Sequence, residues 1–484
     1  MYQTNIITKI DVGSRVAEQE TEGLKTYFQE TQLWHSILNE KTDIIFGCKG
    51  SGKSALYTNL PNKEYDLLEK NVHLLLAENP RGTIAFKDLS TTPPSTEFEF
   101  KSIWKLYFIV LISQKLSEEH YSDENFNHVV EKLQDSDLLP RRLSFTSIVK
   151  MVRDYIRRIN PTFEPNVGLD QYSGMVNKVG VKISLLEPST KESDKGIVSL
   201  DHLLELLNRS LKQKKEKVWL SIDRLDAIFQ DNFDLEATAL RTLFQVYLDL
   251  QQYENLRLII FLRDDIWNRI IEGGFREASH LIKTDTIRWD KNSLFNLLMS
   301  RIINNSEIVA FFGLNSKSPN LREDLFKRIF PSKNRENTDF NFEWIITRIK
   351  DAFDNATPRE LIQLVEVAIK TEIRSISETR SQTSSLLTIE ALLEGVRETS
   401  KTKVETLISE YPTLKTYILR LKGKKPRLKF EELKDIWDVG KKDAVIITNN
   451  LVKIGFFKNE SDNDEYNILF IPTIFRPYLR IQYV

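Results

Sequence analysis

One octapeptide constrains the fold of this chain more than any other stretch of its sequence: residues 47–54 read GCKGSGKS. A short buried strand is predicted from Asp43 to Phe46 before it, and a helical pattern from Ser54 to Leu60 follows it. The glycines let backbone N–H groups turn inward around an anion, and the helix that follows adds its positive N-terminal end. This spacing and context predict a phosphate-binding loop between a buried strand and a helix.

The loop gives each of its polar residues an expected role. Lys53 can reach the β- and γ-phosphates of a nucleotide, and the Ser54 hydroxyl can ligate Mg²⁺. Cys48, the only cysteine of the chain, occupies a variable position and is interpreted as a small filler. The alternative for the whole stretch is a chance match to a glycine- and serine-rich turn. The residues expected to hold ATP here are Gly47, Gly50, Ser51, Gly52, Lys53, Ser54 and Ala55.

The surrounding sequence indicates α/β structure. Wholly apolar strands alternate with helices, which is typical of a parallel sheet with helices on both faces. Besides the strand before the loop, strands are predicted at Gly82–Leu89, Val179–Leu185, Val218–Ile222 and Leu256–Leu262. Helices are predicted at residues 24–40, Phe100–Leu116, Leu200–Leu211 and Ala237–Leu250.

We expect three domains. Residues 1–300 form the core around the phosphate loop, with a polar insertion at about 117–199 that has no assigned role. Residues 301–378 form a helical lid, and a polar linker follows at 379–385. Residues 386–484 form a C-terminal domain in which three short helices precede a β-hairpin, the order of a winged helix.

A metal-bound nucleotide needs a carboxylate near the loop, and Asp223 is the expected one. It ends the apolar strand Val218–Ile222 and would contact Mg²⁺ through water; the alternative is a turn or helix-cap aspartate. The next residue is Arg224, where a glutamate would polarise the attacking water, and the next acid is Asp226. Asp226 is either a weak substitute or a structural turn residue, so slow hydrolysis is expected.

Two arginines are candidates to sense the γ-phosphate. Arg263 follows the strand Leu256–Leu262, and the carboxyl ends of parallel strands line the ligand crevice. Its alternative role is an ion pair with Asp264 or Asp265. Arg359 projects from a helix start in the sequence TPREL, where proline presets the first turn. Its alternative role is a pair with Glu360 or a neighbouring acid.

The C-terminal domain carries a local positive charge. Residues 421–460 hold ten Lys or Arg and six Asp or Glu, in a chain whose net charge is −1. Basic residues of this kind can neutralise phosphates of duplex DNA. The alternative is a winged helix that binds protein or packs on its own core. The candidate contacts are Lys424, Lys425, Arg427, Lys441 and Lys442.

Other classes of protein are disfavoured. One cysteine and six scattered histidines leave no metal-ligand spacing and no disulfide pair. The N-terminus lacks the apolar core of a signal peptide, and the longest apolar run, Leu106 to Ile112, is too short to cross a bilayer. A cytoplasmic protein without membrane contact is expected.

Taken together, these motifs resemble the ASCE-class P-loop ATPases. The resemblance rests on KGSGKSA at 49–55, IDRLD at 222–226, IIFLR at 259–263 and TPREL at 357–361. It is closest to the STAND-like and origin-recognition-like AAA+ branches, and to bacterial ATPases met in anti-phage defence loci. It implies a sheet of strand order 5-1-4-3-2, a helical lid and a winged helix. It makes Asp223 the Walker B acid, Arg263 sensor-1-like and Arg359 sensor-2-like.

Three functions follow from these expectations. The first is an ATP- and Mg²⁺-dependent regulatory switch with slow turnover, acting in anti-phage defence through a separate effector protein. The second is an initiator- or loader-like ATPase that acts on duplex DNA. The third, disfavoured by the long helical tail, is a small-molecule phosphotransferase. Self-association is left open.

Overall fold

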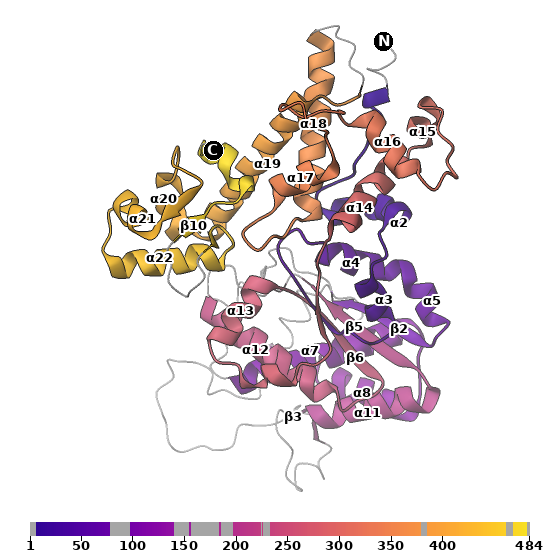
Figure 1. Ribbon diagram of the computed structural model, residues 1–484. Helices are drawn as coiled ribbons and strands as arrows, with labels where there is room; N and C mark the ends of the chain where they lie inside the picture. Colours follow the sequence, from indigo (N-terminus) through magenta and orange to yellow (C-terminus); the bar gives the residue numbers. More distant parts are fainter. Residues whose placement is uncertain are drawn as a thin grey trace. The chain divides into compact units, whose positions relative to one another are not determined.

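The computed structural model describes residues 6–77, 97–139, 154–155, 183–184, 197–223, 225, 233–378, 385–460 and 468–481 (Figure 1). The chain forms two compact units. The sheet unit comprises Thr31–Cys48 and Leu56–Ile287, and the helical unit comprises Met1–Glu30, Lys49–Ala55 and Arg288–Val484.

The sheet unit is built on five parallel strands. In chain order they are β1 (Ile44–Gly47), β2 (Val72–Ala77), β5 (Lys217–Ile222), β6 (Leu256–Arg263) and β7 (Thr284–Thr286). Their order across the sheet is β2-β5-β6-β1-β7, and every neighbouring pair is parallel. Numbered 1 to 5 along the chain and read from the β7 edge, this is the order 5-1-4-3-2, so the predicted strand order is confirmed.

One face of this sheet carries the main core of the unit. Side chains alternate between the two faces of a strand, and every second residue of β1 and the central strands, such as Ile44, Leu220 and Ile260, belongs to one hydrophobic cluster. Helices α7 (Glu97–Glu118), α11 (Leu200–Lys214) and α12 (Phe233–Leu250) supply the rest of that cluster. The Trp104 indole donates to the Ala239 carbonyl at 2.9 Å and ties α7 to α12.

Helices also cover the opposite face, as the sequence predicts. Ile45, Ile259 and Phe261 are buried on that face. Tyr57 of α4 (Lys53–Asn59) packs edge-on against Phe261 with ring centroids 6.1 Å apart. The Tyr57 hydroxyl donates to the Ala77 carbonyl at 2.5 Å, so it also fixes the end of β2.

Shorter elements complete the described part of the sheet unit. They are α3 (Gln32–Leu38), η2 (Leu60–Lys63), α5 (Glu64–Leu68), α8 (Glu124–Asp135), α13 (Asp264–Glu272) and η5 (Arg276–His280), with a separate parallel pair β3 (Ile183–Ser184) and β4 (Val198–Ser199).

Two predictions for this region are corrected or left open. The single helix predicted at residues 24–40 is wrong: α2 (Thr21–Tyr27) ends first, and Thr31 caps the start of α3 by accepting a hydrogen bond from the Trp34 N–H. An extended Thr31 that supplies its own side-chain acceptor starts a new helix. The strand predicted at Gly82–Leu89 lies outside the described residues, as does most of Val179–Leu185.

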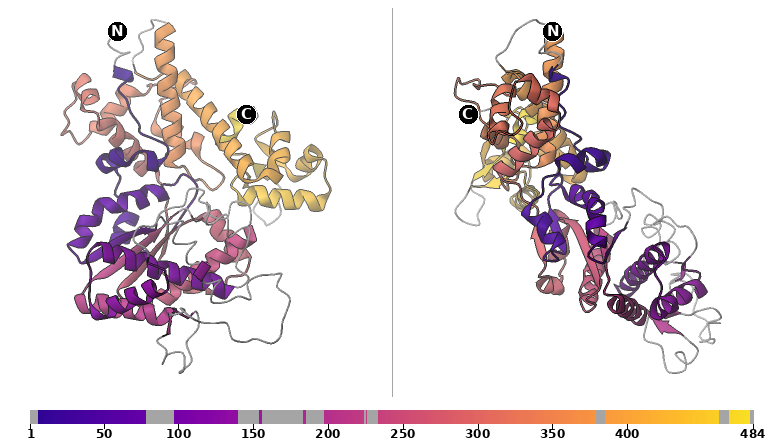
Figure 2. Two further views of the ribbon diagram at one scale, coloured as in Figure 1. Left: turned by 180° about the vertical axis from the view of Figure 1, so that it is seen from behind. Right: turned by 90° about the vertical axis from the view of Figure 1, so that its right-hand side faces the viewer.

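The helical unit is formed by α-helices around a second core. Its elements before the C-terminal part are η1 (Ala17–Gln19), α2, α14 (Lys291–Ile303), α15 (Ser306–Phe311), α16 (Leu321–Ile329), α17 (Phe342–Ile349), α18 (Pro358–Glu378) and α19 (Ile389–Glu410). Helices α18 and α19 lie side by side (Figures 1 and 2). A methyl group on Gly395 would lie 2.3 Å from the Leu364 carbonyl oxygen, so only glycine allows this close approach.

The C-terminal part of the helical unit has the element order of a winged helix. Helix α20 (Lys415–Arg420), strand β8 (Arg427–Lys429), α21 (Phe430–Trp437) and α22 (Lys441–Lys453) precede β9 (Lys458–Asn459) and β10 (Ile468–Phe470). Strand β10 pairs antiparallel with both β8 and β9. The predicted hairpin is therefore present, and its first strand begins at Lys458. The sequence did not predict β8, whose charged ends flank a single buried leucine, Leu428.

None of the helices in the described ranges is both long enough and apolar enough to span a lipid bilayer.

Candidate nucleotide site

The predicted phosphate loop has the strand–loop–helix context that its chemistry requires. Strand β1 ends at Gly47, and α4 begins at Lys53. Gly50 and Gly52 have φ angles of +87° and +104°. Residues other than glycine rarely adopt positive φ angles of this kind. The two glycines are therefore needed for the path of the backbone.

Arg359 lies against this loop within the helical unit. A methyl group on Gly50 would lie 2.9 Å from the Arg359 Cβ, 3.3 Å from its Cδ and 3.1 Å from the Thr357 Oγ1. Arg359 is the second residue of α18, which begins at Pro358 as the sequence predicts. The structure thus brings together the loop and an arginine from a distant helix start.

The neighbouring Glu360 does not pair with Arg359. Glu360 is 5% exposed and accepts hydrogen bonds from the Lys403 ammonium at 2.8 Å and from the Thr357 hydroxyl. Arg359 itself forms no ion pair with any residue in the described ranges. Arg359 is therefore a cationic residue whose Cβ and Cδ lie against a glycine-rich loop, and the carboxylate of the neighbouring Glu360 is already paired with Lys403.

Two further contacts hold the loop residues in place within the helical unit. Lys49 forms an ion pair with Glu410, the last residue of α19. The Trp289 indole N–H donates to the Ser51 carbonyl at 2.7 Å. Sequence reasoning missed Trp289, Lys403 and Glu410, because no motif or spacing connects them to residues 47–54.

Asp223 and Arg263 lie at the carboxyl edge of the sheet in the sheet unit. Asp223 follows the end of β5 and is 4% exposed. Arg263 ends β6, and its register partner in β1 is Gly47. Because β6 lies between β5 and β1, the sheet places both residues near the strand end from which the phosphate loop departs.

Arg263 is engaged by a carboxylate in this structure. Its Nε and Nη2 donate to the two carboxylate oxygens of Asp265, each at 2.9 Å. This ion pair is one of the alternatives that the sequence left open for Arg263. Arg224 and Asp226 lie outside the described residues.

The basic residues of the C-terminal part are distributed over two elements and a turn. Lys424 and Lys425 are exposed in the turn before β8, and Lys441 and Lys442 are exposed at the start of α22. Arg427 is exposed on β8, but its Nε donates to Glu460 at 2.8 Å. The structure describes no ion pair for the four lysines, so their charges are the more available ones.

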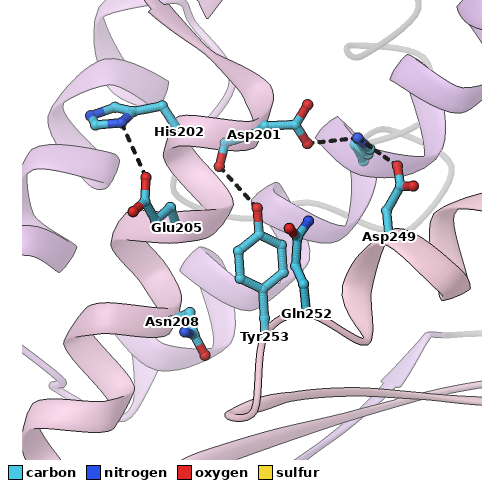
Figure 3. Close-up of a pocket in the computed structure, with 8 residues that line it drawn as sticks. Asp201, His202, Glu205, Asn208, Asp249, Gln252 and Tyr253 are labelled. Atoms are coloured by element: carbon cyan, nitrogen blue, oxygen red, sulfur yellow. Dashed lines mark hydrogen bonds and ion pairs between the residues drawn. The ribbon is translucent and has the colours of Figure 1, made fainter.

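A cavity of about 690 Å³ lies elsewhere, among helices of the sheet unit (Figure 3). Buried Lys105 bridges Asp201 at 2.6 Å and Asp249 at 2.8 Å, and Tyr253 donates to the Asp201 carbonyl at 3.3 Å. Burial opposes the charged form of Lys105, but the two carboxylates outweigh it and raise the pKa of the lysine. These groups satisfy one another, so the network joins α7, α11 and α12, and none of the predicted site residues lines the cavity.

No protein-family model matches the sequence, and no curated protein matches it. Solved structures similar to this chain include the ORC2 protein of Aeropyrum pernix in ADPNP–ADP complexes, at 11% identity and a TM-score of 0.40 over 95% of this chain and 91% of that chain. Its ADP form matches at 12% identity and 0.33 over 93% and 89%. The ORC1 protein of Aeropyrum pernix in complex with DNA matches at 11% and 0.28 over 58% and 69%. Similarities this remote do not bear on the function of this chain.

Proposed function

We propose that this protein binds a nucleoside triphosphate with Mg²⁺ at residues 47–54 and acts as a nucleotide-dependent switch that turns over slowly. The observation that carries the proposal is the placement of Arg359 against Gly50 without an ionic partner among the described residues. An unpaired guanidinium at a glycine-rich loop fits an anionic ligand, because charge-assisted bonds from arginine to phosphate are strong and directional.

The remaining residues keep the roles that the sequence gives them. Lys53 contacts the β- and γ-phosphates, and Ser54 ligates the metal. Asp223, buried at the carboxyl edge of the sheet, is the proposed carboxylate for Mg²⁺. The arginine at position 224 in place of a glutamate favours slow hydrolysis. Asp226 as a water-orienting group and Arg263 as a second sensor remain predictions.

The contacts of Arg359's own segment support a switch rather than a simple pocket. Thr357 and Glu360 flank Arg359, and Glu360 pairs with Lys403 of α19. The preceding loop touches the winged helix, because the Ala352 N–H donates to the Gly455 carbonyl at 3.1 Å and Lys458 pairs with Asp354 at 2.7 Å. A phosphate that binds Arg359 therefore contacts a segment that is also bonded to α19 and to the winged helix.

Calorimetry on the full chain with Mg-ATP and Mg-ADP tests this function. Wild-type protein is expected to bind both, and ATP more tightly. Arg359→Ala should weaken ATP binding by about 10- to 100-fold, the worth of one charge-assisted hydrogen bond, and leave ADP nearly unchanged. Arg359→Lys keeps the positive charge but loses the bidentate guanidinium, so its ATP affinity should lie between those of the wild type and Arg359→Ala. An unchanged ratio of ATP to ADP affinity in Arg359→Ala would overturn the proposal.

Lys53→Ala and Asp223→Asn complete the test. Lys53→Ala should weaken both nucleotides, because it removes a contact to the phosphates that both share. Asp223→Asn should reduce the dependence of affinity on Mg²⁺ concentration. If both variants bind nucleotide as the wild type does, the assignment of the loop fails.

A second candidate function, contact with duplex DNA, is supported by one face of α22. Exposed Lys442, Ile446, Asn450 and Lys453 follow one another at helical spacing, and Ile446 is 58% exposed. Ala444, Ile447 and Leu451 face the core instead. A helix with lysines at both ends of a solvent face, and an amide and an apolar side chain between them, suits a nucleic-acid groove. The effector partner, the defence context, self-association and phosphate transfer to a small molecule remain predictions from the sequence.

A further inference from the structure

Trp289 makes a specific contact with the phosphate loop that no motif assigns. It lies between β7 and α14 and packs against the core of the helical unit. Its Nε1–H donates to the Ser51 carbonyl oxygen at 2.7 Å. A methyl group on Gly52 would lie 3.9 Å from its Cζ2, so the indole also lies next to the following residue of the loop. The indole therefore bonds the loop to a fixed part of the unit.

The geometry of a peptide bond gives this contact a consequence. The described chain contains no cis peptide bond, so the bond between Ser51 and Gly52 is trans. In a trans peptide the carbonyl oxygen and the following N–H point in opposite directions in one plane. Because the Ser51 carbonyl points toward the Trp289 indole, the Gly52 N–H of the same peptide points away from the indole. One hydrogen bond thus sets the orientation of one donor of the loop.

Ser51 supplies a second, independent sign of a ligand at this point. It is 1% exposed, and its hydroxyl has no hydrogen-bond partner in the part of the chain that the structure describes. A buried hydroxyl without a partner costs about 1–3 kcal/mol, which a ligand that accepts its hydrogen bond would recover. A phosphate oxygen bound in the loop would accept a hydrogen bond from the Ser51 hydroxyl.

We propose that Trp289 is a positioning residue for the phosphate chain of the nucleotide: it holds the Ser51–Gly52 peptide with its N–H turned toward the ligand. This inference rests on the proposed nucleotide site. It assigns Trp289 to recognition of phosphate, and not to stacking on the base. Because the bond is made to the backbone, the assignment applies to any ligand with a diphosphate group.

The test compares ligands that share the phosphates but not the base. In Trp289→Phe, the ring is kept and the N–H is lost. Loss of one hydrogen bond should weaken Mg-ADP and Mg-pyrophosphate by the same factor, about two- to tenfold. Trp344→Phe, the same substitution on α17 of the same unit, should change neither. A Trp289→Phe variant that weakens ADP but binds pyrophosphate normally would assign the indole to the base and overturn the proposal.

A pair of side-chain analogues at position 289 separates positioning from packing. Replacement of the indole by benzothiophene keeps its shape and removes the N–H, and should reproduce the loss seen in Trp289→Phe. Replacement by 7-azaindole keeps the N–H and should restore both affinities. If the benzothiophene variant binds as tightly as wild type, only the role of Trp289 fails. If wild-type protein binds neither ADP nor pyrophosphate, the nucleotide site itself fails.

Discussion

The side chain of Arg359 lies directly on the main chain of Gly50, close enough that a methyl group on Gly50 would come within 2.9 Å of the Arg359 Cβ. The two residues are distant in the sequence, and both belong to motifs that the sequence singles out. Their contact is possible because glycine has no Cβ and because the loop takes a positive φ at this point. The absence of one methyl group therefore gives an arginine access to the phosphate loop.

The first prediction concerns Gly50→Ala. The substitution adds a steric clash to the cost of about 1–2 kcal/mol for a left-handed L-residue. The loop or Arg359 must shift, so Mg-ATP affinity should fall by about tenfold or more in calorimetry. Gly313→Ala is the matched control, because Gly313 has a φ of +61° and nothing within 4 Å of an added methyl group. It should lose a similar amount of stability without loss of affinity; equal affinities in the two variants would contradict the prediction.

Much of the sheet unit can be predicted from sequence, because buried parallel strands are apolar throughout. Strands β5 and β6 fall at the predicted places, and the strand order agrees with the family resemblance. Strand β2 was missed because His73 interrupts its apolar run. In the structure the two ring nitrogens of His73 lie 2.6 Å from Glu119 and 3.0 Å from Glu216. Partners supplied from distant residues make a polar side chain acceptable in a strand, and sequence alone does not show them.

The candidate site likewise contains residues that the sequence predicts and residues that only the structure identifies. Lys53, Ser54 and Arg359 stand out because their spacing follows the geometry of a loop and a helix start. Trp289 donates a hydrogen bond to Ser51 and Lys403 pairs with Glu360, and both partners lie far away in the chain. Nothing in their local sequence distinguishes them from an ordinary surface tryptophan or lysine. Only the tertiary structure identifies residues of this kind.

The second prediction concerns the pair between Lys403 and Glu360. Lys403→Met leaves the buried Glu360 carboxylate without its cation, which should cost about 3 kcal/mol or more in urea unfolding of the full chain. Adding Glu360→Gln should recover most of that loss, because the uncompensated charge is then gone. Lys370→Met is the control, since Lys370 pairs with Glu366 on the exposed face of α18 and should lose less than about 0.5 kcal/mol. Wild-type stability of Lys403→Met would rule out this role for the pair.

The third prediction is a pH dependence in the sheet unit. The Tyr247 hydroxyl donates to Asp43 at 3.1 Å, and burial together with the nearby Asp43 carboxylate raises the pKa of Tyr247. Its pKa is thus higher in the folded than in the unfolded state. The stability it contributes is present below its ordinary pKa of about 10 and is lost as the pH rises toward the folded value.

Urea unfolding of wild type and Tyr247→Phe between about pH 8 and 11 measures this contribution. The wild type should be more stable by about 1 kcal/mol at the lower pH, the worth of the hydrogen bond. Above about pH 10 the difference should shrink, with a slope of at most about 1.4 kcal/mol per pH unit for one proton. Other tyrosines and lysines titrate in both proteins and cancel. A difference that stays constant over this range would contradict the shift.

The fourth prediction tests contact between α22 and duplex DNA. Each lysine that neutralises a phosphate releases counterions from the DNA. The slope of log affinity against log salt therefore changes by about 0.9 for each phosphate contact. Lys441→Glu combined with Lys442→Glu should weaken binding to a duplex of any sequence and reduce the slope of log affinity against log salt by about 2. It should also abolish any stimulation of ATP hydrolysis by DNA. Lys317→Glu combined with Lys327→Glu makes the same change in net charge on exposed lysines outside the winged helix. If both pairs lower the affinity and the slope equally, the attraction is general and α22 is not the DNA-binding surface.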